Sequence, residues 1–190
     1  GLGDVYKRQG CVGASSKGVF GTGVTVALDP RTLGTQIDDG IMDKNLDAKL
    51  LATEKSYLLN VRTKIIDGRI FITGKVDAVE EKLNITKMAW EIKGARSVKS
   101  AITIKGETNF KNSAKDALIT TQLRSALIFS KDVKATNYNI DTINSKTYIF
   151  GIAMNQGEKR KVIEEAKEVY GVKEVIPSII LVDELSRNKN

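Results

Sequence analysis

Apolar residues recur every four positions between residues 39 and 52, which is the spacing of one helix face. The residues on this face are Met42, Leu46 and Leu50. Acidic residues follow the same spacing, at Asp39, Asp43 and Asp47. We interpret them as acids near a helix N-terminus that stabilise the helix macrodipole, because no EF-hand spacing accompanies them. The pattern predicts a helix over residues 39–52.

A hairpin, a second helix and a last strand follow along the chain. The predicted strands are 58–66, 69–76 and 97–105. Asp67–Gly68 separates the first two, and this dipeptide is typical of a tight hairpin turn. Residues 78–93 return to helical spacing, and Gly94 is placed to cap the C-terminus of that helix. The positions at helical spacing are Val79, Leu83, Thr86, Ala89 or Trp90, and Lys93.

The same pattern occurs twice, at a constant offset of 77 residues. IFITGKV at 70–76 corresponds to TYIFGIA at 147–153, and KGARSVKSAITI at 93–104 corresponds to YGVKEVIPSIIL at 170–181. The matched pairs include Leu46/Leu123, Leu50/Leu127, Gly74/Gly151, Glu81/Glu158, Gly94/Gly171, Val98/Val175 and Ile102/Ile179. An ungapped offset over so long a stretch indicates two tandem homologous units.

We therefore predict an α+β protein with two domains, residues 38–105 and 113–182, joined by a short linker at 106–112. Each domain is expected to pack two helices on a three-stranded mixed sheet, in the order α-β-β-α-β. The elements of the second unit are a helix at 113–129, strands at 136–143 and 146–153, a helix at 156–170 and a strand at 172–182. Residues 183–190 form a C-terminal tail in this scheme.

Composition narrows the possible functions. The 190 residues include no histidine and one cysteine, which removes the commonest general base and any ordinary zinc site. We therefore predict no enzyme activity, no catalytic residue, no metal site and no cofactor. The net charge of +7 is spread along the chain. It suits attraction to anionic lipid head groups, whereas nucleic-acid binding would rest on charge alone, so we predict no nucleic-acid partner.

The single cysteine, Cys11, follows Gly10 near the start of the sequence. A small residue before a cysteine is typical of a bacterial lipoprotein cleavage site, after which the cysteine carries acyl chains; the alternative is an incidental free thiol. Residues 12–28 are rich in Gly, Ser and Ala, and we interpret 10–37 as the lipidated cysteine and a flexible tether, the alternative being a tail without a role. Residues 1–9, GLGDVYKRQ, are too polar for a signal segment, and we interpret them as an artefactual leader that replaces it.

Three further stretches carry a resemblance to a known family. They are DPRTLGTQIDDG (29–40), LITTQLRSAL (118–127) and YGVKEVIPS (170–178). With the Gly-Cys junction and both repeats, they make the chain similar to dual BON-domain outer-membrane lipoproteins from Gly10 to about Val182. The BON domain has the α-β-β-α-β order predicted above, and the glycines of the family match Gly74, Gly94, Gly151 and Gly171.

The resemblance implies a non-enzymatic lipoprotein on the periplasmic face of the outer membrane, anchored through Cys11. Val12 after this cysteine, in place of Asp, is compatible with export to that membrane. The resemblance further implies that the second BON domain binds anionic phospholipid, phosphatidylglycerol or cardiolipin. It also implies support of envelope integrity and enrichment at division sites. The alternative that we keep is a periplasmic adaptor that binds another envelope protein or peptidoglycan through a sheet edge or the inter-domain groove.

In this family the lipid contact centres on the first helix of the second domain. The matching residues here are Leu118, Ile119, Thr121, Gln122, Arg124, Ser125 and Ile128. Helical spacing puts Ile119, Leu123, Ala126 and Leu127 in the core stripe. It leaves Leu118 and Ile128 outside that stripe, with Lys111, Lys115 and Arg124 nearby for phosphates. Leu118 stands where the family has Trp, a residue that favours the bilayer interface.

Two questions about this helix stay open from the sequence. Leu118 and Ile128 either face the membrane, or they pack on the sheet or against the first domain. The corresponding helix of the first domain begins with the acids Asp38, Asp39, Asp43 and Asp47. Because like charges repel an anionic leaflet, we expect only the second domain to insert.

Overall fold

Each repeat folds into a three-stranded sheet with helices on one side. The computed structural model describes residues 29–107 and 110–186. The first domain consists of α2 (Leu33–Thr53), α3 (Lys55–Asn60), β1 (Val61–Ile66), β2 (Arg69–Val76), α4 (Val79–Trp90) and β3 (Ser97–Ile104). A short 3-10 turn, η1 (Lys105–Glu107), leads to the second domain. That domain consists of α5 (Phe110–Phe129), η2 (Ala135–Asn137), β4 (Tyr138–Ile143), β5 (Lys146–Ala153), α6 (Gln156–Glu168), β6 (Glu174–Leu181) and η3 (Val182–Glu184).

Both sheets are mixed, as the sequence predicts. Their strand orders are β1-β2-β3 and β4-β5-β6. The hairpin makes the first two strands of each sheet antiparallel, and the following helix returns the chain so that the third strand is parallel to the second. The predicted α+β class and the α-β-β-α-β order of each domain are therefore confirmed, with the short helix α3 as an addition.

Each sheet buries one face under its own helices. Successive side chains of a strand point to opposite faces, so Ile70 and Ile72 of β2 join the first core while Phe71 between them points away. The fully buried members of this core include Leu46, Leu50, Ile70, Ile72, Ile85 and Ile102. The second core contains their counterparts from the second repeat, among them Leu123, Leu127, Ile149, Val162 and Ile179. The two domains thus have separate cores.

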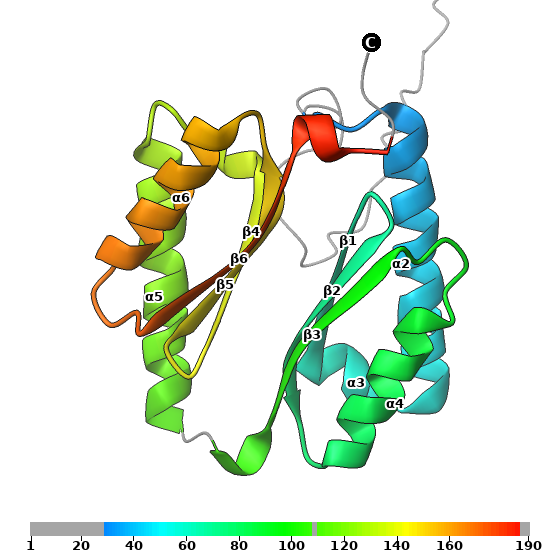
Figure 1. Ribbon diagram of the computed structural model, residues 1–190. Coiled ribbons are helices and arrows are strands. Elements are labelled where there is room, and N and C mark those ends of the chain that lie inside the picture. Colours follow the sequence, from blue (N-terminus) through cyan, green and yellow to red (C-terminus); the bar gives the residue numbers. More distant parts are fainter. Residues whose placement is uncertain (1–28, 108–109, 187–190) are drawn as a thin grey trace, which may run out of the picture.

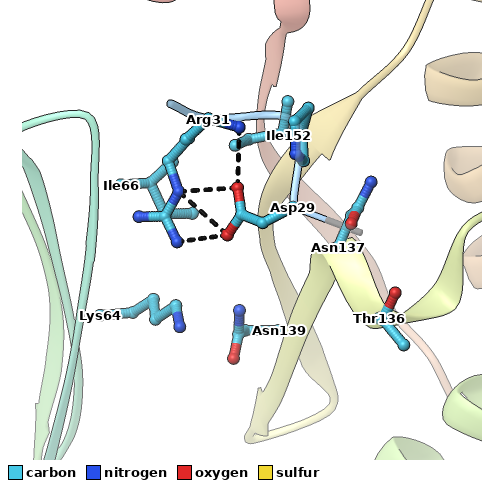
Figure 2. Close-up of a pocket in the computed structure, with 9 residues that line it drawn as sticks. Asp29, Arg31, Lys64, Ile66, Thr136, Asn137, Asn139 and Ile152 are labelled. Carbon is cyan, nitrogen blue, oxygen red and sulfur yellow. Dashed lines mark hydrogen bonds and ion pairs between the residues drawn. The ribbon is translucent and has the colours of Figure 1, made fainter. Parts of the chain in front are cut away.

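The remaining faces of the two sheets pack against each other, which gives four layers in the order helices, sheet, sheet, helices (Figure 1). The apolar cluster between the sheets consists of Ile66, Phe71, Phe150, Ile152, Ile180 and Leu185. The rings of Phe71 and Phe150 stack with their centroids 4.7 Å apart. Elsewhere along the interface a small cleft remains between the domains (Figure 2). The sheet faces are consequently closed, and the helices form the broad outer surfaces.

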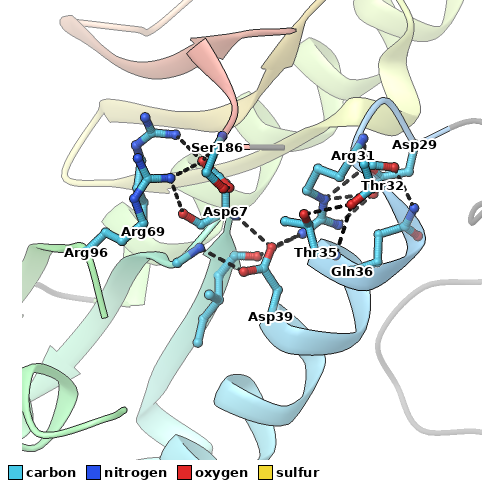
Figure 3. Close-up of polar contacts among 12 residues, drawn as sticks. Asp29, Arg31, Thr32, Thr35, Gln36, Asp39, Asp67, Arg69, Arg96 and Ser186 are labelled. Atoms are coloured by element: carbon cyan, nitrogen blue, oxygen red, sulfur yellow. Dashed lines mark hydrogen bonds and ion pairs between the residues drawn. The ribbon is translucent and has the colours of Figure 1, made fainter. Parts of the chain in front are cut away.

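A buried carboxylate on the first helix of each domain holds the adjoining hairpin turn. Both turns have residues with positive φ, namely Asp67, Gly68, Asn144 and Ser145. Asp39 accepts hydrogen bonds from the N–H groups of Asp67 and Gly68 at 2.7 and 2.8 Å (Figure 3). Asp116, 77 residues later, accepts the equivalent pair at 2.8 Å each. Each carboxylate therefore satisfies two backbone N–H donors of its turn. This stabilises the turns, in which only one of the four residues with positive φ is a glycine.

This arrangement corrects the sequence interpretation of the acids on α2. The helix begins at Leu33 with Thr32 as N-cap, so Asp39 lies in its second turn and beyond the reach of the N-terminal dipole.

Residues 29–37, expected in the tether, belong to the first domain, because Arg31 pairs with Asp29 and Asp39. Burial lowers the pKa of Arg31, but its hydrogen bonds and charge interactions with both carboxylates outweigh burial and raise it. Residues 1–28, including Cys11, lie outside the described residues.

Helix α4 is present as predicted, but most of the positions noted at helical spacing do not face the core. Val79, Leu83 and Trp90 are exposed, and the residues that enter the core are Ile85, Met88, Ala89 and Ile92. Apolar residues lie on both faces of α4, so helical spacing alone could not identify the face that is buried. Gly94 lies four residues beyond the end of α4, with φ of 96°, and shapes the loop to β3 without capping the helix. Strand β1 begins at Val61, later than expected, because Lys55–Asn60 form α3.

The end of the second domain contacts the hairpin of the first. The Ser186 N–H donates to Asp67 Oδ2 at 3.0 Å, and its hydroxyl donates to the other oxygen of the same carboxylate (Figure 3). Arg69 and Arg96 pair with this carboxylate as well. Leu185 is buried between the sheets. Residues 183–186, expected in a tail, therefore help to hold the two domains together.

Candidate membrane-binding face

Helix α5 lies in the outer layer of the second domain, with one side fixed by the core. Ile119, Leu123 and Leu127 are fully buried against the sheet. Asp116 fixes the same side to the β4–β5 turn, as described above. The opposite side of the helix therefore faces solvent.

The structure places six of the seven residues expected to contact lipid on this solvent side. Leu118 and Ile128 are 63% and 65% exposed, so the alternative in which they pack on the sheet or against the first domain is wrong. Thr121, Gln122, Arg124 and Ser125 are also exposed. Ile119 is only 1% exposed and belongs to the core, so its side chain does not reach the surface and the expectation for it is wrong.

Sequence reasoning missed Phe129, the last residue of α5. Its side chain is 84% exposed, the largest exposure among the large apolar side chains that the structure describes on this helix. Phe129 follows Ser125 by four positions and Leu118 by eleven, so these residues share one face. An exposed Phe ring adds apolar surface to this helix, but it lacks the polar N–H of the family Trp that Leu118 replaces. The helical spacing of positions 118, 125 and 129 could have identified it. We call the exposed side chains of Leu118, Ile128 and Phe129 the α5 face.

The cations near the α5 face are unequally available. The Arg124 guanidinium donates to the Ile140 carbonyl at 3.2 Å, which directs it toward β4. Lys115 is exposed. The side chain of Lys111 lies outside the described residues. Over its sequence, α5 carries three basic residues and one acidic residue, and that acid, Asp116, is buried.

The first domain carries matched positions that make a natural control. Ile41 and Leu51 of α2 precede Leu118 and Ile128 by 77 residues, and they are 54% and 47% exposed. Leu33 and Ile37 extend this stripe along α2, and Val79, Leu83 and Trp90 are exposed on α4. We call these seven residues the first-domain apolar face. It contains more large apolar side chains than the α5 face.

The acids of α2 do not cover this apolar face. Asp39 is buried, and Asp43 and Asp47 accept hydrogen bonds from the Thr63 hydroxyl of β1 at 3.0 and 3.4 Å. They therefore face the sheet, and local shielding by these three acids does not distinguish the domains. The net charges of the two helices still differ, because α2 carries four acidic and two basic residues, although the domains as a whole do not differ in this sense.

The two apolar faces belong to helices of different domains. Each belongs to helices in an outer layer, and the two sheets separate these layers (Figure 1). Among residues 29–107 and 110–186, no helix is both long and apolar enough to cross a membrane, and no cluster of three potential metal ligands is found.

Comparison with known proteins agrees with this architecture. The BON domain family model matches residues 38–106 and 115–183. The chain is 30% identical to the outer membrane lipoprotein DolP of Haemophilus influenzae over 182 residues, which covers 92% of this chain and 90% of that protein. It is also 30% identical to an uncharacterised protein in the gshII 5′ region of Anaplasma centrale, over 76% of this chain and 95% of the relative. A 21 kDa hemolysin of Actinobacillus pleuropneumoniae is 24% identical, over 82% of this chain and 80% of that protein. The chain therefore belongs to the BON domain family, and it contains two BON domains.

Proposed function

We propose that this protein is a non-enzymatic, lipid-anchored protein of the outer membrane that binds anionic phospholipid through the α5 face. Its anchor would be Cys11, and it would face the periplasm. The similarity to an outer membrane lipoprotein over most of both chains supports the location. The observation that carries the lipid-binding role is the exposure of Leu118, Ile128 and Phe129 on one outer helix. As the family resemblance implies, the proposal includes support of envelope integrity and enrichment at division sites.

The charge of the two outer helices favours α5 over α2 as the membrane contact. Three basic residues and one acidic residue give α5 a net charge of +2, whereas two basic and four acidic residues give α2 a net charge of −2. Each basic residue near an anionic leaflet contributes about 1 kcal/mol. An apolar face of similar exposure therefore binds phosphatidylglycerol or cardiolipin better on α5 than on α2.

Matched substitutions test this proposal directly. Residues 29–190 would be titrated with vesicles of phosphatidylglycerol and of phosphatidylcholine. Full burial of a leucine side chain contributes about 1.5–3 kcal/mol, and most of Leu118 is open to a membrane. With the added repulsion of an acid, Leu118→Glu should weaken binding to phosphatidylglycerol roughly 30- to 150-fold.

The repeat supplies the control for this experiment. Ile41→Glu makes the same chemical change at the equivalent position of α2 and should leave vesicle affinity within about twofold, provided that both variants keep the wild-type circular dichroism spectrum. Loss of binding in Ile41→Glu together with retention in Leu118→Glu would transfer the membrane contact to the first domain. Equal binding to both lipids would contradict the selectivity for anionic lipid.

The first-domain apolar face favours a second candidate function, that of an adaptor. Its helices lie in the outer layer opposite that of α5 (Figure 1), and the proposal is that this face stays free when α5 is on a membrane. A photo-crosslinking residue at Leu83 should then form an adduct with an envelope protein in cells, while the same residue at Leu118 should form lipid adducts. Protein adducts at Leu118 and lipid adducts at Leu83 would reverse the assignment. A peptidoglycan partner would leave both without a protein adduct and would appear in sedimentation with purified sacculi.

A further inference from the structure

Helix α4, in the outer layer of the first domain, carries a row of side chains that its own core does not use (Figure 1). Intervals of four, three and four residues place the members of this row on one side of the helix: Val79, Leu83, Thr86 and Trp90. More than half of the surface of Val79, Leu83 and Trp90 is exposed. The core is filled from the other side of α4, by Ile85, Met88 and Ala89. We call the four residues of the row the α4 seam.

Thr86 does not interrupt the apolar character of the α4 seam. Its hydroxyl donates to the Lys82 carbonyl, one turn earlier in the same helix, at 2.8 Å. The polar group is therefore satisfied within the helix, and the methyl group is available for packing. From Val79 to Trp90 the seam extends about 16 Å along the helix.

The second repeat shows that a BON domain does not need apolar side chains at these positions. The equivalent residues of α6, 77 positions later, are Gln156, Arg160, Ile163 and Lys167. Three of them are polar or charged, as is usual on the solvated side of a helix. Ile163, the apolar member of this set, is partly buried against the second core. The large apolar side chains of the α4 seam are therefore a property of the first repeat and not of the fold.

The α4 seam is complementary to itself when two helices run antiparallel. If a two-fold axis passes midway along the seam, Val79 of one copy lies opposite Trp90 of the other, and Leu83 lies opposite Thr86. Each contact then joins a large side chain to a smaller one, which allows the facing rows to interdigitate. A parallel pair would instead place the two Trp90 rings against each other.

The charges beside the seam favour the same antiparallel arrangement. Glu80 and Lys87 are exposed on one flank of the seam, two helical turns and about 10 Å apart, so they do not pair within one helix. In the antiparallel pair, Glu80 of each copy lies near Lys87 of the other, which gives two symmetric ion pairs. The flank is acidic at one end and basic at the other, and a second helix of reversed direction matches both ends.

We propose that two copies of this protein associate through the α4 seam, with the two α4 helices antiparallel. This inference rests on the adaptor candidate and deepens it, because it names a second copy of the chain as the partner of the α4 part of the first-domain apolar face. Trp90 is the anchor of the contact, since tryptophan residues dominate the binding energy of many interfaces. The contact is smaller than the roughly 1,200 Å² of a stable interface, so we expect a dissociation constant on the order of 100 µM.

The fluorescence of Trp90 tests this pairing, because Trp90 is the single tryptophan of the chain. The full chain would be studied without lipid and with a reductant, which keeps Cys11 from forming a disulfide. Between about 1 µM and about 1 mM the emission should shift to shorter wavelength as the ring leaves water, and sedimentation velocity should show a monomer converting to a dimer. A chain that stays monomeric up to the highest concentration would overturn the proposal.

A substitution copied from the second repeat locates the contact. Leu83→Arg introduces the residue that α6 has at the equivalent position, which is exposed in both helices. It should weaken association at least about tenfold, because it places a charge near the two-fold axis in both copies. Ile37→Arg makes the same kind of change on α2, outside the seam, and should keep the affinity within about twofold. With wild-type circular dichroism spectra, undiminished association in Leu83→Arg or a comparable loss in Ile37→Arg would refute this location.

Exchange of the flanking charges tests the direction of the two helices. Glu80→Lys alone brings like charges together at both ends of the pair and should weaken association about 2- to 10-fold. The double variant Glu80→Lys/Lys87→Glu restores opposite charges and should return to within about twofold of the wild-type affinity. A double variant that associates no better than Glu80→Lys would contradict the antiparallel pairing.

The remaining outcomes separate this inference from the proposed function. Association is measured without lipid, so its failure leaves the vesicle binding of the α5 face unaffected. A photo-crosslinking residue at Leu83 should form an adduct of two copies of this chain in cells. An adduct with a different envelope protein, together with a monomeric chain in solution, would keep the adaptor candidate and overturn the pairing of two copies. Lipid adducts at Leu83 would overturn both.

Discussion

Removal of one aromatic ring between the sheets should uncouple the two BON domains. Phe150 stacks on Phe71 with a centroid distance of 4.7 Å, and both rings are buried in the inter-sheet cluster, outside the cores of the individual domains. Phe150→Ala should therefore weaken domain association and leave each domain folded. Buried Phe→Ala substitutions cost about 3–5 kcal/mol. The Arg62–Asp141 pair cannot compensate, because its arginine is exposed and such pairs contribute about 0–1 kcal/mol.

The chain offers a convenient assay for this uncoupling. Its single tryptophan, Trp90, lies in the first domain, so its fluorescence reports on that domain, whereas far-ultraviolet circular dichroism reports on both. We expect the two urea transitions to coincide in the wild type and to separate in Phe150→Ala, with a lower midpoint for at least one domain. Phe129→Ala removes an exposed ring as a control and should shift stability by less than about 0.5 kcal/mol. Coincident transitions in Phe150→Ala, with a loss below about 1 kcal/mol, would refute the idea that the sheet interface couples the domains.

Three further outcomes follow from local geometry. Gly151→Ala should destabilise the second domain by more than about 2 kcal/mol in urea denaturation, because an ideal Cβ would lie 2.4 Å from the Asn137 carbonyl oxygen. Asp116→Ala should cost about 2–4 kcal/mol by the same measurement, since two amides of the β4–β5 turn lose their acceptor, whereas loss of the exposed Asp132 carboxylate should be nearly neutral. The lowered pKa of Lys64 means that the unfolded chain binds more protons between that pKa and the ordinary value of 10.5. The free energy of unfolding should therefore increase with pH across this window. This increase should be absent in Lys64→Met, which chemical denaturation at several alkaline pH values would show.

The repeat made the fold of each domain predictable from the sequence. Each turn, strand and helix occurs twice, so a clear signal in one repeat supports the prediction in the other. Asp67–Gly68 identified the first hairpin, and the repeat extended this prediction to Asn144–Ser145, which alone is a weaker turn signal. The inward face of α4 was not predictable in the same way, because Leu83 and Trp90 on one side are as apolar as Ile85 and Met88 on the other. Only packing against the sheet decides which side is buried.

The sequence contains a signal that the two sheets pack against each other, but helix and strand periodicity alone does not reveal it. A strand with one solvated face alternates apolar and polar residues, but Ile70, Phe71 and Ile72 are consecutive, as are Ile149 and Phe150 with Ile152 nearby. Continuous apolar runs indicate strands covered on both faces. On the α5 face, by contrast, helical spacing placed Leu118 and Ile128 outside the core stripe but left open whether they pack elsewhere, and their exposure is a finding of the structure.

Anchoring and face chemistry have separate roles in the proposed function. If Cys11 carries the lipid, as we propose, residues 12–28 can span at most about 60 Å, which exceeds the length of any helix of either domain. Tether length therefore does not select between the α5 face and the first-domain apolar face. The tether does keep the domains at high local concentration near the bilayer, so a face that contributes only a few kcal/mol binds there effectively. A weak face suffices under these conditions, and the sign of its charge decides which face it is. In the proposed function, the +2 charge of α5 and the −2 charge of α2 favour contact of the α5 face with the anionic surface, which would leave the larger apolar face of the first domain for a protein partner.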